Sequence, residues 1–567
     1  MSRQLFDDFW SWRMKQSPEF GTMTGCKEYN DVLETFTDER FEDDFKSCNK
    51  FIERANELMK STTDPNEKLN LEFFIAELST YTDGYHLNGF YFPINYMEGV
   101  HIDFQRLPEW ATPVCVKDYE DLLARYRAFP AYAGQIVDMM RVGMKKQLTN
   151  HMVSMKGVVE QCKEHGSAVA EETAFYKPFM EADNIDKTDK EMLQNAARDI
   201  IKNFVQVGFM KIADFLESEY LAACRPDIAA TSLPGCGPEF YKACLKFHTS
   251  TDLTAEQIHE KGVKEVARIE GDMREVIKKL GLEMSLTDFM EKLRNDKANY
   301  FNSEQELLDA FSTIIHDRIN PKLDTIFHSC PKSKLEITEV PVADYPAAFY
   351  IAGTEDGARP GKLFVNTFKF ASQPRYEMVS LALHETNPGH HLQGSYMLEK
   401  EGMPQFRKVM EDRVYSQAPS RFPINTAYVE GWGLYSETLG HDLGLYDDPM
   451  DKYGHLSEEI FRACRLVVDT GMHAMGWTME QAVQYMMDLS AASKENIVGE
   501  VNRYVTWPGK AVGCKIGQTK IIELRRRVEK AMGDKFDIKQ FHEVVLRAAG
   551  PLNILERQVD QWINNNS

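Results

Sequence analysis

Apolar residues recur at intervals of three and four positions through most of the first half of the chain, the spacing that gathers them on one face of an α-helix. The pattern predicts helices at residues 5–14, 39–60, 65–79, 117–129, 135–150, 151–164 and 190–220. Between them, residues 85–104 are rich in aromatic side chains and glycine, which is typical of a long ordered loop or a short hairpin. We expect those aromatic side chains to pack in the core.

The second half of the chain mixes helical and strand patterns. Thr254 and Gln257 form a capping box ahead of a helix predicted to end at residue 280, and two further helices are predicted at residues 286–293 and 303–323. A helix that starts near Pro374 is predicted to run to His384. Short β-rich stretches precede this helix at residues 335–342, 347–351 and 362–366. We therefore predict a mainly α-helical protein with a small β-sheet beside the helix that ends at His384.

Proline and glycine cluster at residues 233–238, which indicates a boundary between two parts of the chain. A chain of 567 residues is long enough for two or more lobes, each with its own core. We predict a helical N-terminal lobe at residues 1–235 and a second, catalytic lobe at residues 236–567. We expect the two lobes to interleave in one compact unit.

The helix predicted to end at His384 leads into the sequence His-Glu-Thr-Asn-Pro-Gly-His-His, residues 384–391. A zinc hydrolase of the HExxH kind needs two neutral histidines one helical turn apart to bind one ion. It also needs a glutamate beside the first histidine to accept a proton from water. His384 and Glu385 match the start of that pattern. The place of the second histidine holds Pro388, which binds no metal and disrupts a helix.

Two histidines compete for the second place. If Pro388 and Gly389 form a two-residue bulge, His390 falls where the second ligand belongs, and we favour it. His391 is the alternative, because a separation of seven residues returns to the same helix face about 10 Å farther along the axis, and a bend must close that distance. A third interpretation is a helix that ends at Pro388 and is followed by two surface histidines.

A catalytic zinc site usually has three protein ligands, so a third ligand is expected. Glu430 is the candidate, because it is an acid within an otherwise aromatic and small-residue helical stretch at residues 426–437. Glu437 lies seven residues later on the same helix face and is suited to accept a hydrogen bond from a ligand histidine. The alternative for Glu430 is an exposed acid on a helix surface.

Three segments of the chain resemble a known family. Residues 383–393, the Glu-Gly-Trp-Gly-Leu-Tyr run at 430–435 and the Arg-Tyr-Val-Thr-Trp-Pro-Gly run at 503–509 resemble the domain-of-unknown-function 885 family of zincin-like proteins. That family is similar, at greater distance, to helical gluzincins such as angiotensin-converting enzyme and the thermostable carboxypeptidases. The resemblance extends over nearly the whole chain. It implies a two-lobed, helical zincin-like fold around a deep channel.

The resemblance also implies the roles of the motif residues. It implies that Zn²⁺ is bound by His384, His390 and Glu430, with Glu385 as the general base and His391 as the alternative to His390. In gluzincins an edge strand beside the active-site helix pairs with the extended substrate backbone. Residues 349–351 or 363–365 are candidates for that strand, and an ordinary small sheet is the alternative. Lys510 and Cys514 depart from the Gln and Tyr that are usual in the family.

Two later segments are candidates for contacts to the transition state. Asp469 and His473 are four residues apart on one predicted helix face, so an imidazolium oriented by Asp469 can bind the oxyanion of an amide hydrolysis. A core histidine with its hydrogen bonds satisfied is the alternative for His473. Arg503 is a candidate to bind a substrate carboxylate, and the hydroxyl of Tyr504 is a candidate donor to the oxyanion.

Composition and charge limit the possible partners. The 87 acidic and 66 basic residues give a net charge of -21, which argues against nucleic acid or an anionic membrane surface as a partner. The ten cysteines are scattered without a CxxC pair, which favours free thiols in a reducing compartment. The first ten residues hold acids and aromatics where a signal peptide needs an uninterrupted apolar run, and no long apolar run follows. We expect a cytoplasmic protein.

Together these observations predict a zinc metallopeptidase that hydrolyses peptide bonds of short peptides. One alternative is a zinc amide hydrolase that acts on non-peptide or conjugated amino acids. Another is a non-catalytic binding protein on the same scaffold, for which the arguments are the altered HExxH spacing and the departures at Lys510 and Cys514. The presence of Glu385 favours catalysis over binding alone.

Overall fold

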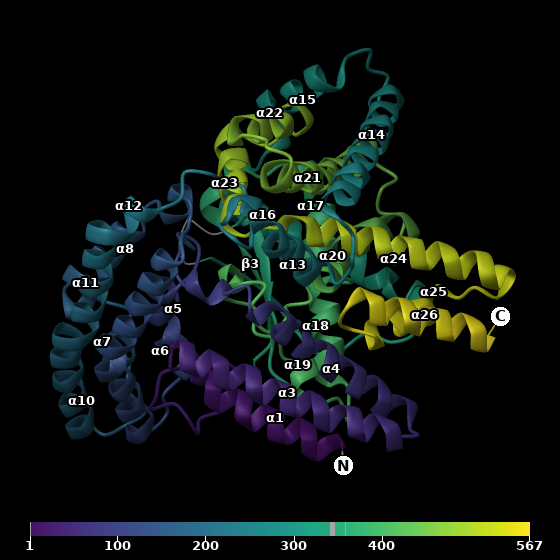
Figure 1. Ribbon diagram of the computed structural model, residues 1–567. Coiled ribbons are helices and arrows are strands. Elements are labelled where there is room, and N and C mark those ends of the chain that lie inside the picture. Colours follow the sequence, from purple (N-terminus) through teal and green to yellow (C-terminus); the bar gives the residue numbers. More distant parts are fainter. Residues whose placement is uncertain (1, 341–345, 356, 358, 567) are drawn as a thin grey trace. The chain divides into compact units, whose positions relative to one another are not determined.

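The computed structural model of the chain is mainly helical and describes residues 2–340, 346–355, 357 and 359–566 (Figure 1). The chain forms two compact units. Unit 1 comprises Met1–Ala243, Pro404–Ile424 and Val505–Trp507, and unit 2 comprises Cys244–Met403, Asn425–Tyr504 and Pro508–Ser567. Each unit is therefore built from several separate segments of the chain, and the first segment of unit 1 ends shortly after the predicted boundary at residue 235.

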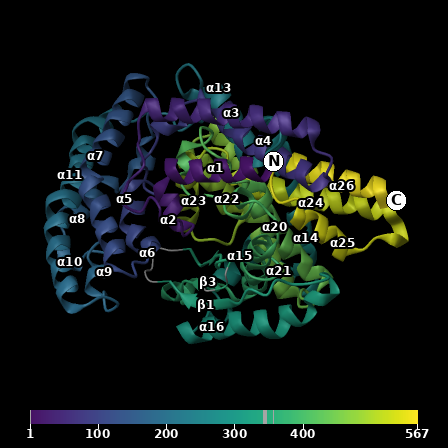
Figure 2. The same ribbon diagram turned by 90° about the horizontal axis from the view of Figure 1, so that it is seen from below.

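Unit 1 is built from helices whose apolar faces pack on one another. Its helices are α1 (Ser2–Gln16), α2 (Pro18–Met23), α3 (Asp38–Ser61), α4 (Pro65–Tyr85), α5 (Val100–Asp103), α6 (Leu107–Ala111), α7 (Val116–Lys145), α8 (Val158–Ser167), α9 (Lys177–Met180), α10 (Lys187–Ile200), α11 (Gln206–Phe215), α12 (Leu221–Ala223) and α19 (Gln405–Lys408). Helix α11 lies beside α7 and α8, and α10, which precedes α11 in the same helical run, lies beside α7 (Figures 1 and 2). The helices predicted at residues 5–14, 39–60 and 65–79 are confirmed as α1, α3 and α4.

Two predictions for unit 1 were wrong in detail. The helices predicted at residues 117–129 and 135–150 are one helix, α7, which runs through Pro130 and ends at Lys145. Proline costs one main-chain hydrogen bond, but its fixed φ is compatible with a helix. Buried side chains such as Phe129 and Ala133 hold both halves in the core. The helix predicted at residues 151–164 is instead a short turn, Met152–Met155, followed by α8.

The aromatic segment at residues 85–104 is a loop with short helical turns and a single bridge between Asn95 and Glu98. Its aromatic side chains Phe90, Tyr91 and Phe104 are buried, as expected for packing residues. The long helix predicted at residues 190–220 is confirmed as α10, α11 and α12, joined by π-helical turns.

Unit 2 contains the remaining helices and the sheet. Its helices are α13 (Gly237–Thr249, which begins in unit 1), α14 (Ala255–Lys279), α15 (Leu286–Asn295), α16 (Glu304–Thr313), α17 (Met378–Glu385), α18 (His390–Glu399), α20 (Thr426–Asp442), α21 (Pro449–Ala474), α22 (Met479–Leu489), α23 (Lys494–Thr506, which ends in unit 1), α24 (Lys510–Met532), α25 (Ile538–Arg547) and α26 (Leu552–Asn566). Helix α14 packs on α21, and α20 packs on α24. The predicted capping box of Thr254 and Gln257 is confirmed at the start of α14.

Glycine allows the main chains of α20 and α24 to touch. A Cβ atom on Gly517 would lie 1.7 Å from the Ala427 carbonyl oxygen, and one on Gly431 would lie 2.5 Å from the Gly517 Cα atom. Larger residues at these positions would force the helices apart. The close approach fixes α20, which carries Glu430 and Glu437, against α24.

The small sheet has three strands, β1 (Leu335–Glu339), β2 (Ala348–Ile351) and β3 (Gly361–Val365), in the order β1-β3-β2. Strand β3 pairs in parallel with β1 and antiparallel with β2. The three predicted strands are confirmed, although residues 341–342 of the first lie outside the described residues. Strand β2 is an edge strand that packs against α17 and α18, whereas β3, which contains residues 363–365, is central and paired on both sides.

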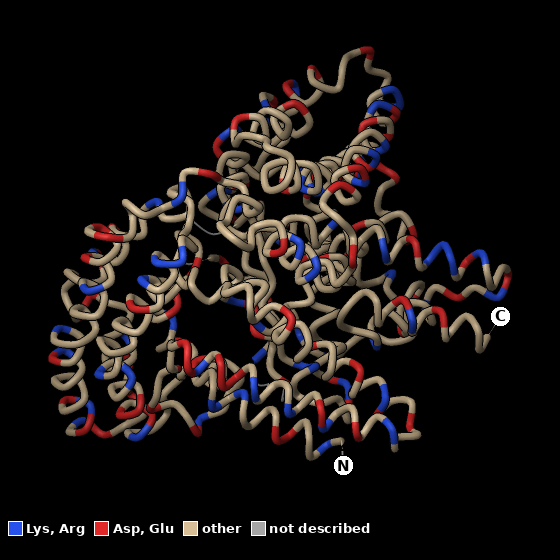
Figure 3. The backbone as a smooth tube through the Cα atoms, viewed as in Figure 1, with Lys and Arg blue, Asp and Glu red and all other residues tan. Residues whose placement is uncertain are grey.

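Acidic and basic residues are interspersed along the helices of each unit (Figure 3). On α24, for example, Arg525 pairs with Asp442 of α20, and Arg527 pairs with Glu556 and Asp560 of α26. Within the residues that the structure describes, none of the helices combines the length and the apolar character needed to cross a bilayer.

Candidate metal centre

The helix that carries the His-Glu motif ends where the sequence predicts. All of its last four residues, Ala382 to Glu385, are buried, and α17 stops at Glu385. Pro388 lies in the short connection that follows, and α18 begins at His390. A Cβ atom on Gly389 would lie 1.9 Å from the His384 carbonyl oxygen, so the chain crosses the end of α17 at a distance that only glycine permits. The Trp432 indole N–H donates to the Pro388 carbonyl at 2.8 Å and ties the connection to α20.

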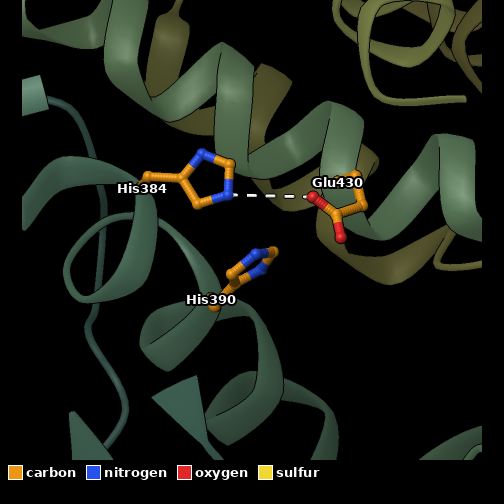
Figure 4. Close-up of side chains that lie close together, drawn as sticks. All are labelled: His384, His390 and Glu430. Atoms are coloured by element: carbon orange, nitrogen blue, oxygen red, sulfur yellow. Dashed lines mark ion pairs between the residues drawn. The ribbon is translucent and has the colours of Figure 1, made fainter. Parts of the chain in front are cut away.

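This bend brings His384 and His390 together with Glu430 of α20 (Figure 4). One ligand atom from each of the three residues lies within 4.8 Å of the other two. The Nε2 atom of His384 is 3.8 Å from a Glu430 carboxylate oxygen, and the two imidazole rings meet edge to face at 4.7 Å. It is the only such group of three or more metal-binding side chains in the described part of the chain.

The donor set fits a metal ion of the zinc type. Two imidazoles and one carboxylate are the ligands of many catalytic zinc sites, and donors about 2.1 Å from one tetrahedral ion lie about 3.4 Å apart. The 3.8 Å between His384 and Glu430 is close to that spacing. Glu437 accepts a hydrogen bond from His384 Nδ1 at 2.8 Å, so in the neutral ring the Nε2 atom has the lone pair that a metal needs.

The electrostatics of the group also suit a cation. Burial raises the pKa of Glu430, but Lys510, His390 and His384 outweigh this effect and hold the pKa at about 2. Burial and the neighbouring His384 lower the pKa of His390 to about 4, so this ring is neutral near pH 7. Burial lowers the pKa of His384, but Glu437, Glu385 and Glu430 together raise it above its ordinary value. A carboxylate and a neutral imidazole are therefore available at neutral pH.

Glu385 lies beside the group without belonging to it. Its side chain is buried, and burial raises its pKa to about 7, with His384 opposing the effect and Glu430 adding to it. A carboxyl group with a pKa near the working pH can both accept and return a proton. The environment of Glu385 therefore suits a general acid and base.

His391 faces a different partner. It is buried, its Nδ1 atom is 3.2 Å from the Tyr350 hydroxyl, and its ring meets the Tyr350 ring at 5.4 Å. The structure thus brings His390, and not His391, to His384 and Glu430. The interpretation in which two surface histidines follow a helix end does not apply. Both histidines belong to the first turn of a new helix, α18, which continues to Glu399.

The other candidate residues lie outside this group. His473 is fully buried, and its Nε2 atom is 2.9 Å from the Tyr504 carbonyl oxygen, the arrangement of a core histidine. The Asp469 carboxylate accepts the N–H of Gly509 at 3.2 Å. Neither residue is one of the three that gather at His384.

Tyr504 and Arg503 gather around Glu500 on their own helix, α23. The Tyr504 hydroxyl donates to Glu500 at 2.8 Å, and an Arg503 nitrogen is 3.4 Å from the same carboxylate. Arg465 of α21 also pairs with Glu500, at 2.9 Å. Arg465 additionally lowers the pKa of Glu430, after the larger effects of burial, Lys510 and the two histidines. It therefore connects the Glu500 cluster with the metal-ligand group.

Sequence reasoning missed three residues near the site. Arg465 could have been found, because it lies within the apolar run from Ala463 to Val468, where an unpaired charge would be costly. Ser380 and His455, which contact Glu437, carry no comparable signal, because a serine and a histidine are ordinary residues on helices. Cys514 is 3.7 Å from a Glu430 oxygen, which places one of the two departures from the family pattern beside a candidate ligand.

Comparisons with known proteins identify the family and the fold. A family model described as "Bacterial protein of unknown function (DUF885)" matches residues 18–559. The crystal structure of "the putative lipoprotein" from Colwellia psychrerythraea is similar to this chain with 27% identity and a TM-score of 0.89, over 100% of this chain and 99% of that one. A "putative lipoprotein of unknown function" from Shewanella oneidensis shares the fold, with 18% identity, a TM-score of 0.72 and coverage of 98% and 99%. A comparison with curated proteins finds no match.

Proposed function

We propose that this chain, which belongs to the DUF885 family, is a zinc-dependent hydrolase that cleaves peptide bonds of short peptides. One observation carries the proposal: His384, His390 and Glu430 bring three ligand atoms within 4.8 Å of one another, directly beside the buried Glu385. A structural zinc site has four protein ligands, whereas a catalytic one keeps a position open. Three ligands beside a carboxyl group with a pKa of about 7 support the catalytic kind.

The residues of the chain divide the work in this proposal. Zinc, when bound, makes a water molecule more acidic and polarises the carbonyl group of the substrate. His384, His390 and Glu430 hold the ion, and Glu437 orients His384 through its Nδ1 atom. Glu385 accepts a proton from the attacking water and returns it to the leaving amine. The raised pKa of Glu385 supports both directions of transfer near neutral pH.

The substrate contacts are a further part of the proposal. Strand β2, at the edge of the sheet and packed on α17, is the candidate to pair with an extended peptide. Arg503, whose side chain keeps a quarter of its surface exposed, is the candidate for a substrate carboxylate. His473 and Tyr504 stay candidates for the oxyanion, and such a role requires each to exchange a hydrogen bond that it makes here. A two-lobed zincin-like fold with a deep channel remains the expectation for the whole molecule.

Two observations support different locations of the protein in the cell. None of the ten cysteines, all of them among the described residues, forms a disulfide, which supports a reducing compartment such as the cytoplasm. The two solved structures are each described as a putative lipoprotein, which supports a location outside it. Fractionation of the native cells, with detection of the chain in the soluble, membrane and extracytoplasmic fractions, decides between them.

The proposal is tested by turnover of a panel of substrates. Zinc-loaded chain is incubated with di-, tri- and oligopeptides and with N-acylated amino acids, and the products are identified by mass spectrometry. Glu385→Gln, which keeps the side-chain size but cannot accept a proton, is the matched control. We expect cleavage of short peptides by the wild type and none above background by the variant. Cleavage of only the acylated amino acids would replace the peptidase by another amide hydrolase. No cleavage of any substrate by a zinc-loaded chain would refute the catalytic proposal.

A further inference from the structure

Both oxygens of the Glu437 carboxylate have partners on neighbouring helices. Oε1 accepts the hydrogen bond from His384 Nδ1 at 2.8 Å, and Oε2 accepts one from the Ser380 hydroxyl at 2.9 Å. The His455 Nδ1 atom of α21 is 3.7 Å from the same Oε2 atom and 3.4 Å from the Ser380 hydroxyl oxygen. All four side chains are buried. The orientation of the carboxylate is thus set from α17, α20 and α21 together.

Ser380 is placed to act on His384 through Glu437. It lies four residues before His384 on α17, so the two side chains share one face of that helix. A carboxylate bound at one oxygen only can still turn about its last side-chain bond, whereas one bound at both oxygens is fixed in its plane. When Oε2 is held by Ser380, Oε1 is held where the His384 ring needs its acceptor.

Tyr446 contacts both Glu437 and His455. The Tyr446 hydroxyl donates to the Glu437 carbonyl oxygen at 2.8 Å, and the Tyr446 ring stacks on the His455 ring at 4.9 Å with an interplanar angle of 13°. The main chain and the side chain of Glu437 are therefore both tied to this cluster. The Ser380 hydroxyl is engaged with Glu437, and His455 is not one of the three side chains that gather as candidate ligands.

We propose that Ser380 is a positioning residue of the metal centre, which fixes the Glu437 carboxylate and thereby aims the Nε2 atom of His384 at the ion. His455 supports the same carboxylate from α21. The inference rests on the proposed function, since it assigns the ion to His384. The inference adds to the centre a residue one helical turn before His384, in addition to the three ligands and Glu437.

The test compares two buried serines. Ser380→Ala removes the donor to Glu437. Ser436→Ala is the matched control, because Ser436 is equally buried and adjoins Glu437 on α20, but its hydroxyl has no hydrogen-bond partner among the described residues. The affinity for Zn²⁺ is measured by competition with a chromogenic chelator, and the visible absorption of the Co²⁺-loaded chain reports the ligand geometry. Thermal unfolding of the metal-free variants reports folding.

We expect Ser380→Ala to lose about 10- to 100-fold in zinc affinity, the usual effect of removing an outer partner of a metal ligand, and to change the Co²⁺ spectrum. Ser436→Ala should remain within about twofold of the wild type. Ser380→Thr, which keeps the hydroxyl, should keep most of the affinity. In a Glu437→Ala background, Ser380→Ala should have no further effect, because the path from Ser380 to His384 is already cut.

Three results would overturn the inference. Zinc affinity of Ser380→Ala equal to that of Ser436→Ala would show that the hydroxyl does not position the centre. An undiminished effect of Ser380→Ala in the Glu437→Ala background would show that it acts by another route. Absence of zinc binding by the wild type would refute the proposed function itself, and the inference with it. If Ser380→Ala fails to fold, the zinc affinity of Ser380→Thr decides, and a loss as large as that of Glu437→Ala contradicts the role of the hydroxyl.

Discussion

Gly433 allows the His384 ring to lie against the main chain of α20. A Cβ atom at this position would lie 2.8 Å from His384 Cε1, 2.9 Å from Nε2 and 3.1 Å from Nδ1. Ordinary contacts of a Cβ atom begin at 3.4 Å. In Gly433→Ala the ring must therefore withdraw, by about 0.6 Å to reach ordinary contact, since repulsion rises steeply below contact distance. Helix α20 cannot retreat instead, because Gly431 already brings it against Gly517 of α24.

The substitution should weaken zinc binding while the metal-free chain still folds. Overpacking costs about 1–3 kcal/mol, and the better helix propensity of alanine offsets about 1 kcal/mol of it. The free energy of unfolding should therefore fall by no more than about 2 kcal/mol. The displaced ring loses either its bond to Glu437 or its aim at the ion, and disturbance of this kind lowers metal affinity about 10- to 100-fold. That loss corresponds to about 1.4–2.7 kcal/mol of binding free energy.

The assay measures zinc affinity by chelator competition and stability by thermal unfolding of the metal-free chain. Gly271→Ala is the matched control, because Gly271 lies on the exposed face of α14 and a Cβ atom there meets nothing within 4 Å. This variant should keep its zinc affinity and gain about 0.5–1 kcal/mol of stability. Wild-type zinc affinity in a folded Gly433→Ala would refute the reasoning, since the ring would then have room for the methyl group.

Three further predictions concern the base, the metal and a buried carboxylate. Glu385→Gln should bind zinc as tightly as the wild type while its turnover of a cleaved peptide falls at least about 10²-fold; turnover that persists would exclude Glu385 as the base. Removal of zinc by a chelator should lower the unfolding temperature, because a ligand present at about 100 times its Kd adds about 2.7 kcal/mol of stability; an unchanged temperature would speak against a bound ion. Burial raises the pKa of Glu411 in unit 1, but Arg413, Arg13 and Arg421 outweigh this effect and lower the pKa from an ordinary 4.5 to about 2. The ionised Glu411 therefore contributes its full stabilisation above pH 4.5 and loses it as the pH falls toward 2. The difference in free energy of unfolding between wild type and Glu411→Gln should shrink on titration from pH 6 to pH 3. A constant difference would contradict an origin in the lowered pKa of Glu411.

Local patterns predicted the parts of the fold and site that local chemistry determines. The capping box at Thr254 and the break at Pro388 follow from the residues themselves, and both are present. The bulge at Pro388 and Gly389 is the reason why His390 reaches His384, which the spacing of the motif suggested. Glu437 was expected as an acceptor for a histidine from its seven-residue distance to Glu430, and it accepts from His384.

Features that depend on distant packing could not be predicted in this way. Pro130 stays inside α7 because buried side chains on both sides of it hold the helix, and that burial depends on other helices. Ser380, His455 and Arg465 reach the site only through the packing of α17, α20 and α21. The hydrogen bond of His473 to the Tyr504 carbonyl likewise joins residues 31 positions apart. Contacts of this kind leave no periodic signal in the sequence.

The measurement that tests the account most directly is the metal content of the purified chain by mass spectrometry. It compares the wild type with His390→Ala, His391→Ala and Glu430→Ala, each expressed with ample zinc and checked for folding. We predict about one zinc per wild-type chain. The zinc should be retained in His391→Ala, whose ring faces Tyr350, and lost in His390→Ala and Glu430→Ala. Absence of zinc from the wild type, or its loss with His391→Ala but not with His390→Ala, would contradict the metal centre described here.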